Sequence, residues 1–317
     1  MIEKRFNLYN RIVACVSLVV SAVTYLLTIE PSASFWDCGE FIASSYKLEV
    51  GHPPGNVTFQ LIARFFTLFF DSPAVAVNVC SALCSAFTIF FLYLTIVFLA
   101  KRVIEKEENG EYSVPSAIAI FGSGLVGALV YTFSDTFWFS AVEAEVYSMS
   151  SLFTAIVFWA MTKWYEQADE AHSNRWIVFI SLIMGLSIGV HLLNLLPIPA
   201  LVFLYFYRKR EDGKYTGWEY VKIFILRCVI IGIILWIIIP FMPKLAAYFD
   251  LFFVNTLSLP YNSGAIFFML LVITACFLGL FYTLKKEKVF WNTVLLCLTT
   301  IVIGFSVFSI VIIRSCA

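Results

Sequence analysis

The sequence predicts an all-α protein that crosses a membrane several times. Hydrophobic residues make up 61% of the 317 residues and charged residues 13%, whereas soluble domains are about half apolar and about one quarter charged. Apolar runs recur along the chain at lengths near the roughly 20 residues that a helix needs to cross a bilayer. Lysine and arginine gather in alternate connections between these runs. We therefore expect about nine transmembrane helices in a single domain, residues 1–317.

Two of the apolar runs need separate interpretation. Segment 176–207 is too long for one helix at about 1.5 Å per residue, so we expect two short helices that meet near His191 and Asn194. Segment 56–70 is short and contains Arg64, which favours a helix in the outer membrane interface over a span. The expected spans are 12–29, 74–100, 115–133, 149–164, two within 176–207, 223–242, 265–284 and 289–313. The expected outer loops are 30–73, 134–148 and 243–264.

The first apolar run has an alternative interpretation. Residues 1–11 are basic, the run 12–29 is apolar, and small residues follow at 32–34, which is also typical of a cleavable signal peptide. The run is nevertheless about 18 residues long and can span a bilayer. The polar loop that follows also makes more sense if it is tethered at both ends. We therefore favour a retained span.

Three glycines lie close together in the expected span 115–133. Gly122, Gly124 and Gly127 offer a face on which a neighbouring helix can pack closely, as small residues do in membrane helices.

The lysine and arginine positions predict the orientation. Seventeen of the 21 fall in segments that the nine-span topology assigns to the cytoplasm, in agreement with the positive-inside rule. The four on the other side are Lys47, Arg64, Lys244 and Arg314. One wrong span would invert every later assignment and weaken the bias. We therefore expect the N-terminus in the cytoplasm and the C-terminus outside.

Cysteine and histidine give no pattern of a disulfide framework or a metal site. Six of the eight cysteines lie inside apolar runs, where free cysteine behaves as a small hydrophobic residue. The chain has no CxxC, and its three histidines are scattered. The sequence therefore assigns no metal ligand and no cofactor.

The polar, acidic stretch 30–55 lies between apolar runs and is the first candidate site. Carboxylates cost free energy near lipid, so several of them there point to chemistry or binding. Asp37 and Glu40 are three residues apart, so one helical turn would place both on one face. A solvated loop acid is the ordinary alternative for each acid, and it is the favoured interpretation for Asp71 and Asp250.

The turn 51–55, GHPPG, follows this acidic pair. Two prolines fix its backbone, and glycines at both ends allow unusual dihedral angles. Such a turn can hold His52 at a defined place near the carboxylates. The alternative is a turn that only breaks a helix.

The second outer loop contributes further polar candidates. Asp135 lies in a polar helix start, Ser134 to Thr136. Glu143 and Glu145 alternate along the loop, and Glu143 with Tyr147 forms an i,i+4 pair.

A lone histidine on an apolar helix, such as His191, is more often a packed core residue than a site residue. Asn194 at the expected helix break keeps a functional interpretation open for both residues.

These segments carry a family resemblance. SFWDCGEF (34–41) followed by GHPPG resembles the first outer loop of the protein O-mannosyltransferases, in which an acidic pair precedes an HPP turn. The chain is most similar to the protein O-mannosyltransferase-like family abundant in Bacteroidetes, in the GT-C superfamily. SDTFWFSAVEAEVYSMS (134–150) and GLSIGVHLLNLLP (185–197) resemble later motifs of that family. Its members usually continue into a large soluble C-terminal region, which we expect to be absent here.

The resemblance implies a GT-C-like helical bundle that transfers a sugar from a polyprenyl-phosphate-linked donor to an acceptor hydroxyl, for instance of a protein serine or threonine. A polyprenyl phosphate leaves as a stabilised anion, so one carboxylate base suffices for an inverting displacement. We expect Asp37 to be that base and Glu40 to orient the acceptor or sugar. Arg64 is the expected phosphate-binding cation. The expected substrate-binding residues are His52, Arg64, Asp135, Glu143, Glu145, Tyr147, His191 and Asn194.

Two other functions remain open at the level of the sequence. A transporter usually carries polar residues within broken spans, whereas these spans are nearly free of charge. A non-catalytic membrane scaffold would not need Asp37. The expected partners are a lipid-linked sugar donor, an acceptor protein or glycan, and membrane lipids, without nucleic acid. The expected location is the bacterial inner membrane, with the active site on the periplasmic face.

Overall fold

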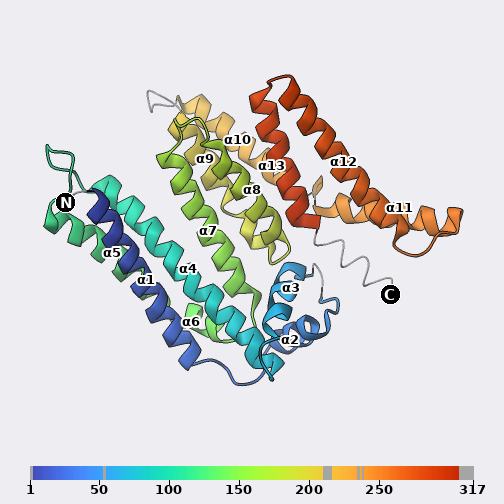
Figure 1. The fold of residues 1–317 in the computed structure, drawn as a ribbon, viewed down its shortest axis with the longest axis horizontal. Coiled ribbons are helices and arrows are strands. Elements are labelled where there is room, and N and C mark those ends of the chain that lie inside the picture. Colours follow the sequence, from blue (N-terminus) through green and yellow to red (C-terminus); the bar gives the residue numbers. More distant parts are fainter. Residues whose placement is uncertain (1–2, 53–54, 210–215, 234–235, 238, 307–317) are drawn as a thin grey trace. The chain divides into compact units, whose positions relative to one another are not determined.

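The computed structural model describes residues 3–52, 55–209, 216–233, 236–237 and 239–306, and every regular element in these ranges is a helix (Figure 1). The α-helices of the first half are α1 (Glu3–Leu27), α2 (Cys38–Lys47), α3 (Val57–Phe66), α4 (Pro73–Val103), α5 (Val114–Thr132), α6 (Asp135–Val142) and α7 (Val146–Glu166). The second half contains α8 (Asn174–Ile188), the 3-10 helix η1 (Leu192–Leu195), α9 (Ile198–Lys209), α10 (Gly217–Ile233), α11 (Ile239–Leu257), α12 (Ser263–Lys285) and α13 (Val289–Phe305).

The predicted all-α membrane class is confirmed. Among the described residues, α1, α4, α5 and α12 are long and apolar enough to cross a bilayer. Helices α6 and α7 form an apolar pair that is bent by 109°, and shorter apolar helices include α8 and α13. The expected number of nine spans is compatible with these helices. The break expected near His191 and Asn194 is also present, since α8 ends at Ile188 and η1 begins at Leu192.

The contacts within the chain divide it into two compact units. Unit 1 contains Met1–Glu49 and Phe59–Thr162, and unit 2 contains Val50–Thr58 and Lys163–Ala317. That residues 1–317 form one functional domain remains a prediction.

Helices α1, α4 and α5 pack against one another and form the body of unit 1 (Figure 1). Helix α4 begins where Ser72 Oγ accepts a hydrogen bond from Val75 N and where Pro73 occupies the first turn, a position that tolerates its missing N–H. A Cβ on Gly124 or Gly127 would lie 2.7 Å from a side chain of α4, whereas Gly122 has no neighbour within 4 Å. Two of the three glycines expected to form a packing face therefore do so.

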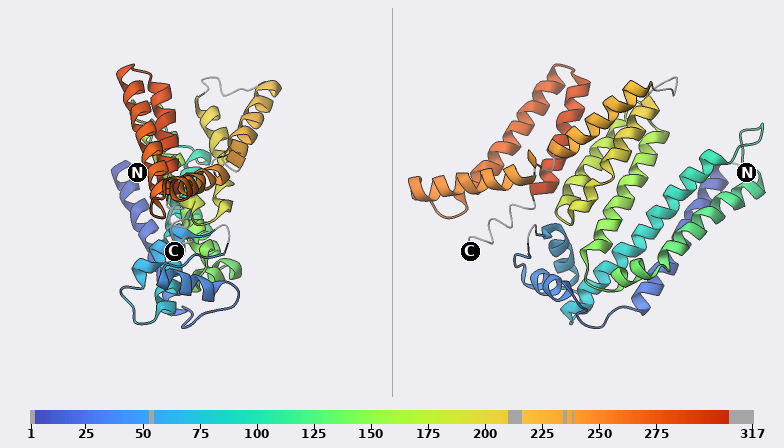
Figure 2. Two further views of the ribbon diagram at one scale, coloured as in Figure 1. Left: turned by 90° about the vertical axis from the view of Figure 1, so that its right-hand side faces the viewer. Right: turned by 180° about the vertical axis from the view of Figure 1, so that it is seen from behind.

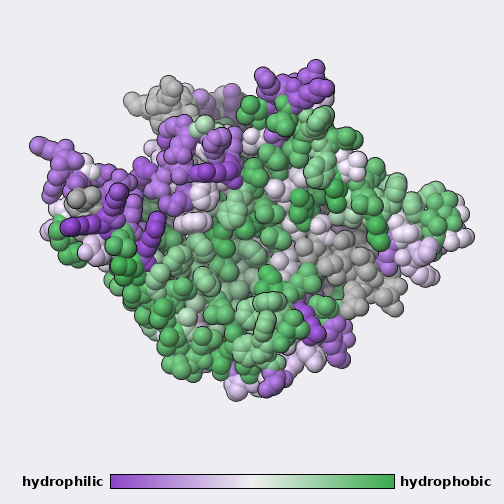
Figure 3. Space-filling view, in the orientation of Figure 1, coloured by the Kyte–Doolittle hydropathy of each residue, from purple (hydrophilic) through white to green (hydrophobic). Residues whose placement is uncertain are grey.

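Most lysine and arginine residues of unit 1 lie at one of its ends. At one end, Lys101 lies over the Phe6 ring and Lys106 over the Tyr112 ring. At the other end, Tyr25 OH donates to Thr132 O, and the acidic loops follow. Figure 3 shows mainly hydrophobic surface along α1 and hydrophilic residues around the connection from α4 to α5. The position of these lysines at one end agrees with the predicted orientation.

Helices α8, α11, α12 and α13 form the body of unit 2. Helix α8 packs closely on α13, because a Cβ on Gly185 would lie 2.6 Å from Ile301 O. Helix α11 runs at a wide angle to α12 (Figure 2). It continues to Leu257, so most of the segment 243–264, expected as the third outer loop, is helical.

Asp250 is buried on α11, and its Oδ1 accepts hydrogen bonds from Gly264 N and Ala265 N at the start of α12. A carboxylate at a helix N-terminus is stabilised by the free N–H groups there. The interpretation of Asp250 as a solvated loop acid is therefore wrong, because this residue is buried and caps the neighbouring helix.

Candidate active site

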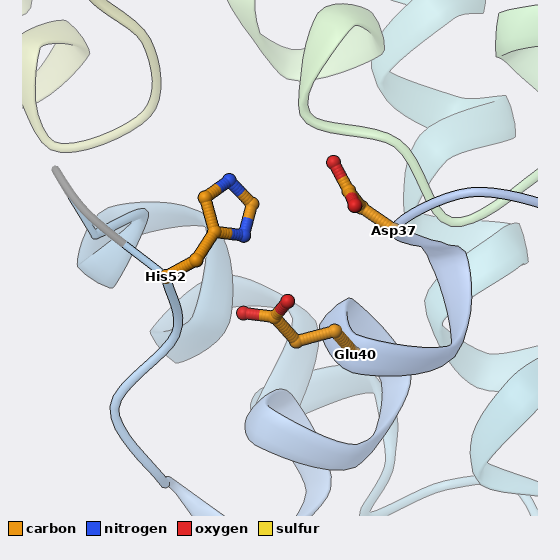
Figure 4. Close-up of side chains that lie close together, drawn as sticks. All are labelled: Asp37, Glu40 and His52. Carbon is orange, nitrogen blue, oxygen red and sulfur yellow. The ribbon is translucent and has the colours of Figure 1, made fainter.

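The first acidic pair lies at the beginning of α2 in unit 1. Asp37 occupies the N-cap position and Glu40 the first turn, and both side chains are exposed (Figure 4). A carboxylate oxygen of Asp37 lies within 4.8 Å of one of Glu40. The predicted shared face is therefore confirmed. Negative charge is favourable here, because the N-terminus of a helix carries a partial positive charge.

Trp36 turns the chain into this helix. Its φ is +60°, a left-handed conformation that is uncommon for a residue with a bulky side chain. The indole is 92% exposed. The chain therefore enters α2 through a sharp turn that presents an aromatic ring next to Asp37.

A second, buried cluster lies behind the same turn. Cys38, Glu143 and Glu145 are 1%, 6% and 9% exposed, and one ligand atom of each lies within 4.8 Å of the others. Cys38 Sγ donates to Glu145 Oε1 at 3.8 Å. The structure thus brings together the two outer loops, and three such atoms are close enough to share a cation, as thiolates and carboxylates can. The sequence reasoning missed Cys38, although its position between Asp37 and Glu40 was a signal.

Burial changes the proton affinity of this cluster. It raises the pKa of Glu145 to about 7, and the neighbouring Glu143 and Asp37 carboxylates add to the effect. Burial also raises the pKa of Glu143, although hydrogen bonds from Ser34 and Cys38 lower this pKa in part. The pKa of the Cys38 thiol rises to about 12, because of burial and then because of the two glutamates. Near neutral pH the cluster therefore holds a proton, and Cys38 is a hydrogen-bond donor rather than a nucleophile.

Backbone contacts tie the two loops together. Glu30 N donates to Val142 O at 3.0 Å, just before the acidic residues of the second loop. Asn78 on α4 donates from Nδ2 to Glu30 O at 2.7 Å and to Ser32 O at 3.1 Å. The bend between α6 and α7 then turns Glu143 and Glu145 toward the first loop.

Arg64 joins α3 to the end of α2. Its Nη1 donates to Tyr46 O at 2.6 Å and to Thr67 Oγ1 at 3.1 Å, and its guanidinium lies 5.1 Å from the centre of the Tyr46 ring. These contacts give Arg64 a structural role in unit 1. Phosphate binding by Arg64 stays a prediction.

The remaining candidates of the second loop, unlike the buried cluster, are exposed to solvent. Asp135 is exposed in the first turn of α6, and Tyr147 is 49% exposed in the first turn of α7.

His52 belongs to the segment of unit 2 that follows α2, and it is drawn in Figure 4. Gly55 N donates to His52 O at 2.8 Å, and Gly55 has a φ of +84°, so the chain turns here. Pro53 and Pro54, which were expected to stiffen this turn, lie outside the described residues.

The same segment docks on the end of α8. Thr58 N donates to Gly189 O at 2.9 Å, and Thr58 Oγ1 donates to Leu186 O at 3.0 Å. Because Gly189 has no Cβ, Thr58 can approach this closely. Two segments that carry the family resemblance, GHPPG and GLSIGVHLLNLLP, are therefore neighbours along unit 2.

His191 and Asn194 close the break between α8 and η1. His191 Nδ1 accepts a hydrogen bond from Leu193 N at 3.1 Å. Asn194 is 1% exposed, and its Nδ2 donates to Ser187 O at 3.2 Å. Both side chains thus have local structural roles, and substrate binding by either stays a prediction.

Comparison with known proteins places this sequence in a family. Residues 37–214 match the model of the protein O-mannosyl-transferase TMEM260 N-terminal domain. The chain is 26% identical over 218 residues to protein O-mannosyl-transferase tmem260 of Dictyostelium discoideum, which covers 63% of this chain and 24% of that relative. It is 31% identical over 175 residues to protein O-mannosyl-transferase TMEM260 of Mus musculus, which covers 55% of this chain and 22% of that relative. No solved structure matches.

The matched region begins at Asp37 and contains Glu40, the second acidic loop 134–148 and the segment around His191. The segments aligned with the two curated relatives span about a quarter of the length of those relatives, 24% and 22%. Because residues 37–214 are more than half of the 317 residues, the chain belongs to the family of the protein O-mannosyl-transferase TMEM260 N-terminal domain.

Proposed function

We propose that this chain is a membrane glycosyltransferase that moves a sugar from a polyprenyl-phosphate-linked donor to an acceptor hydroxyl. The observation that carries the proposal is the meeting of the two acidic loops at one end of unit 1. The names of the relatives favour mannose as the sugar and a protein as the acceptor. Carboxyl groups are the side chains that such a transfer needs, both as a base and as hydrogen-bond partners of sugar hydroxyls.

Asp37 acts as the general base. Its exposed carboxylate takes the proton of the acceptor hydroxyl as the oxygen attacks the anomeric carbon. The bond between that carbon and the phosphate oxygen breaks, and the polyprenyl phosphate leaves as an anion. One displacement inverts the configuration of the anomeric carbon. Glu40, on the same face of α2, orients the acceptor or the sugar.

The other candidates bind substrate. Glu143 and Glu145 contact sugar hydroxyls, with the proton held by the pair available for donation. Arg64 binds the donor phosphate through the N–H groups that do not contact Tyr46 or Thr67, because guanidinium matches phosphate geometry. The further substrate-binding residues of the proposal are His52, Asp135, Tyr147, His191 and Asn194.

The reaction takes place on the non-cytoplasmic side. The positive-inside rule supports this orientation, because lysine and arginine residues gather at the other end of unit 1. For a bacterial host, the site would face the periplasm from the inner membrane.

Sugar transfer by membranes that carry this chain tests the proposal. With a radiolabelled polyprenyl-phosphate mannose and a hydroxyl acceptor, Asp37→Asn is expected to lower the rate by about 10²–10⁴-fold, the usual contribution of a general base. The control is Asp71→Asn, which neutralises an exposed acid beside α4. Unchanged transfer in Asp37→Asn would remove Asp37 from the role of base.

A transporter is the second candidate, favoured by the 109° bend between α6 and α7 and by the break after α8. Solute uptake by the native chain without sugar transfer from any donor would support it.

A further inference from the structure

Asn78 lies at the junction of the two acidic loops but was not among the candidate site residues. It is 1% exposed and is the sixth residue of α4. Its Nδ2 donates to Glu30 O and Ser32 O, which are the backbone acceptors of the loop leading into α2. Glu30 is half-buried and Ser32 is exposed, and one buried amide group serves both of their carbonyls.

We propose that Asn78 is a positioning residue, which holds the loop after α1 so that Cys38 and Asp37 lie beside Glu143 and Glu145. Its effect on catalysis rests on the proposed function, whereas its effect on the position of the loop does not.

The contact is transmitted to the second loop by one backbone hydrogen bond. Glu30 accepts from Asn78 with its carbonyl and donates with its N–H to Val142 O, which precedes Glu143. Both acidic loops therefore meet at Glu30. Loss of the Asn78 donors is expected to free residues 30–32 and to separate Cys38 from Glu145.

The residue type matters because both loop partners are acceptors. Asn78→Asp keeps the shape of the side chain but replaces two N–H donors by an oxygen that faces two carbonyls. Asn78→Ala removes the amide without adding a charge. Asn78→Gln keeps the donors on a longer side chain and is the conservative variant.

Alkylation of Cys38 by a membrane-impermeant maleimide measures the position of the loop without any sugar donor. In the native chain the thiol is 1% exposed and should react slowly. In Asn78→Asp the labelling rate of Cys38, mapped by mass spectrometry, is expected to rise about tenfold or more, since local opening governs access to a buried group. Ser81→Ala is the matched control: Ser81 is also fully buried on α4, and its Oγ has no hydrogen-bond partner among the described residues.

Labelling of two other thiols distinguishes release of the loop from unfolding of the helices. Cys80 and Cys84 are buried on α4, near Asn78, and should stay unlabelled. Labelling of all three cysteines in both Asn78→Asp and Asn78→Ala would mean that Asn78 maintains helix packing, and it would overturn the proposal. Unchanged labelling of Cys38 in both variants would also overturn it.

In catalysis, Asn78→Asp is expected to slow the transfer reaction and to leave donor binding nearly unchanged. Misplacement of a reacting group by about 1 Å can cost about 10²-fold, so Asn78→Asp should lower kcat to this extent. The KM for the donor should change little, because Arg64 is held by α2 and α3, and Asn78→Gln should recover part of kcat. If Cys38 becomes labelled but the native chain transfers no sugar, the proposed function fails and the structural role of Asn78 stands. A fall in donor binding alone would contradict the positioning role in catalysis.

Discussion

Single residues in the acidic site differ mainly in their contact with water. Asp37 and Glu40 are exposed at the start of α2, whereas Glu143 and Glu145 are buried. The buried glutamates have raised pKa values. Environments that separate the proton affinities of nearby carboxyl groups allow one site to contain both a base and a proton donor. Glu145, as the most strongly affected, offers the clearest test.

Glu145→Gln is expected to stabilise the protein at high pH. Burial raises the pKa of Glu145 from 4.5 to about 7, so the folded state binds this proton more tightly than the unfolded state. Stability contributed by the neutral acid is complete below pH 4.5 and is lost as the pH rises through about 7. Glutamine keeps the neutral shape, so the gain should be about 1–3 kcal/mol at pH 8 and near zero at pH 4.5.

The measurement is the thermal unfolding midpoint of the detergent-solubilised protein at both pH values. Asp71→Asn, at an exposed position, serves as the control and should leave both midpoints unchanged. A lower midpoint for Glu145→Gln at pH 8 would show that the carboxylate itself is stabilised, for example by a bound cation.

At the scale of single elements, the first turn of α2 has one exposed face and one buried face. Asp37 and Glu40 face outward, while Cys38 and Phe41 are buried, and the Phe41 ring packs 5.7 Å from that of Phe59. A ten-residue helix is marginal in isolation, so this packing against α3 and the loops must stabilise it. The site therefore depends on elements that hold short helices in place.

Helix packing in unit 1 gives a matched pair of glycine substitutions. A Cβ at Gly124 would lie 2.7 Å from Val97 Cγ2 and 2.8 Å from the buried Tyr93 ring, whereas Gly122 has free space. Gly124→Ala is expected to destabilise the protein by about 1–3 kcal/mol through overpacking. Gly122→Ala should be neutral or stabilising by up to about 1 kcal/mol, because alanine favours helix. Equal thermal midpoints for the two variants would contradict close packing of α5 on α4.

The contact between Thr58 and Gly189 can be tested by a double-mutant cycle. A Cβ at Gly189 would collide with Thr58 Oγ1. Gly189→Ala is therefore expected to cost about 1–3 kcal/mol in the native background and less in a Thr58→Ala background, where this oxygen is absent. Additive shifts of the thermal midpoint would show that the two residues do not touch.

At the scale of the whole molecule, the membrane orientation is the main prediction. In a chain whose native cysteines are replaced by alanine, Asp71→Cys should be labelled by an impermeant maleimide from outside. Glu108→Cys should be labelled only after the cytoplasmic side is opened. The two positions flank α4, whose 31 residues span about 46 Å at about 1.5 Å per residue. Labelling of both from the same side would contradict the topology.

Much of the fold could be predicted from hydropathy and charge, because a helix in a bilayer must be apolar over its full length. The break near His191 was predictable, since segment 176–207 is too long for one span. The helical content of 243–264 was missed: α11 continues through Pro243 to Leu257, and Asp250 caps α12 within its own unit instead of lying in a solvated loop. The role of this acid depends on a neighbouring helix, which local sequence does not specify.

The sequence by itself determined membrane residence, the helical class, the predicted orientation and the shared face of Asp37 and Glu40, because these follow from composition and from helical periodicity. Only the tertiary structure decided that the acidic loops meet, since Cys38 and Glu145 are 107 residues apart. It also decided which acids are buried and that Asn78 holds their junction. Burial and long-range hydrogen bonds at this cluster arise from the packing of α2 and α6 against α4, and no local pattern in the sequence records that packing.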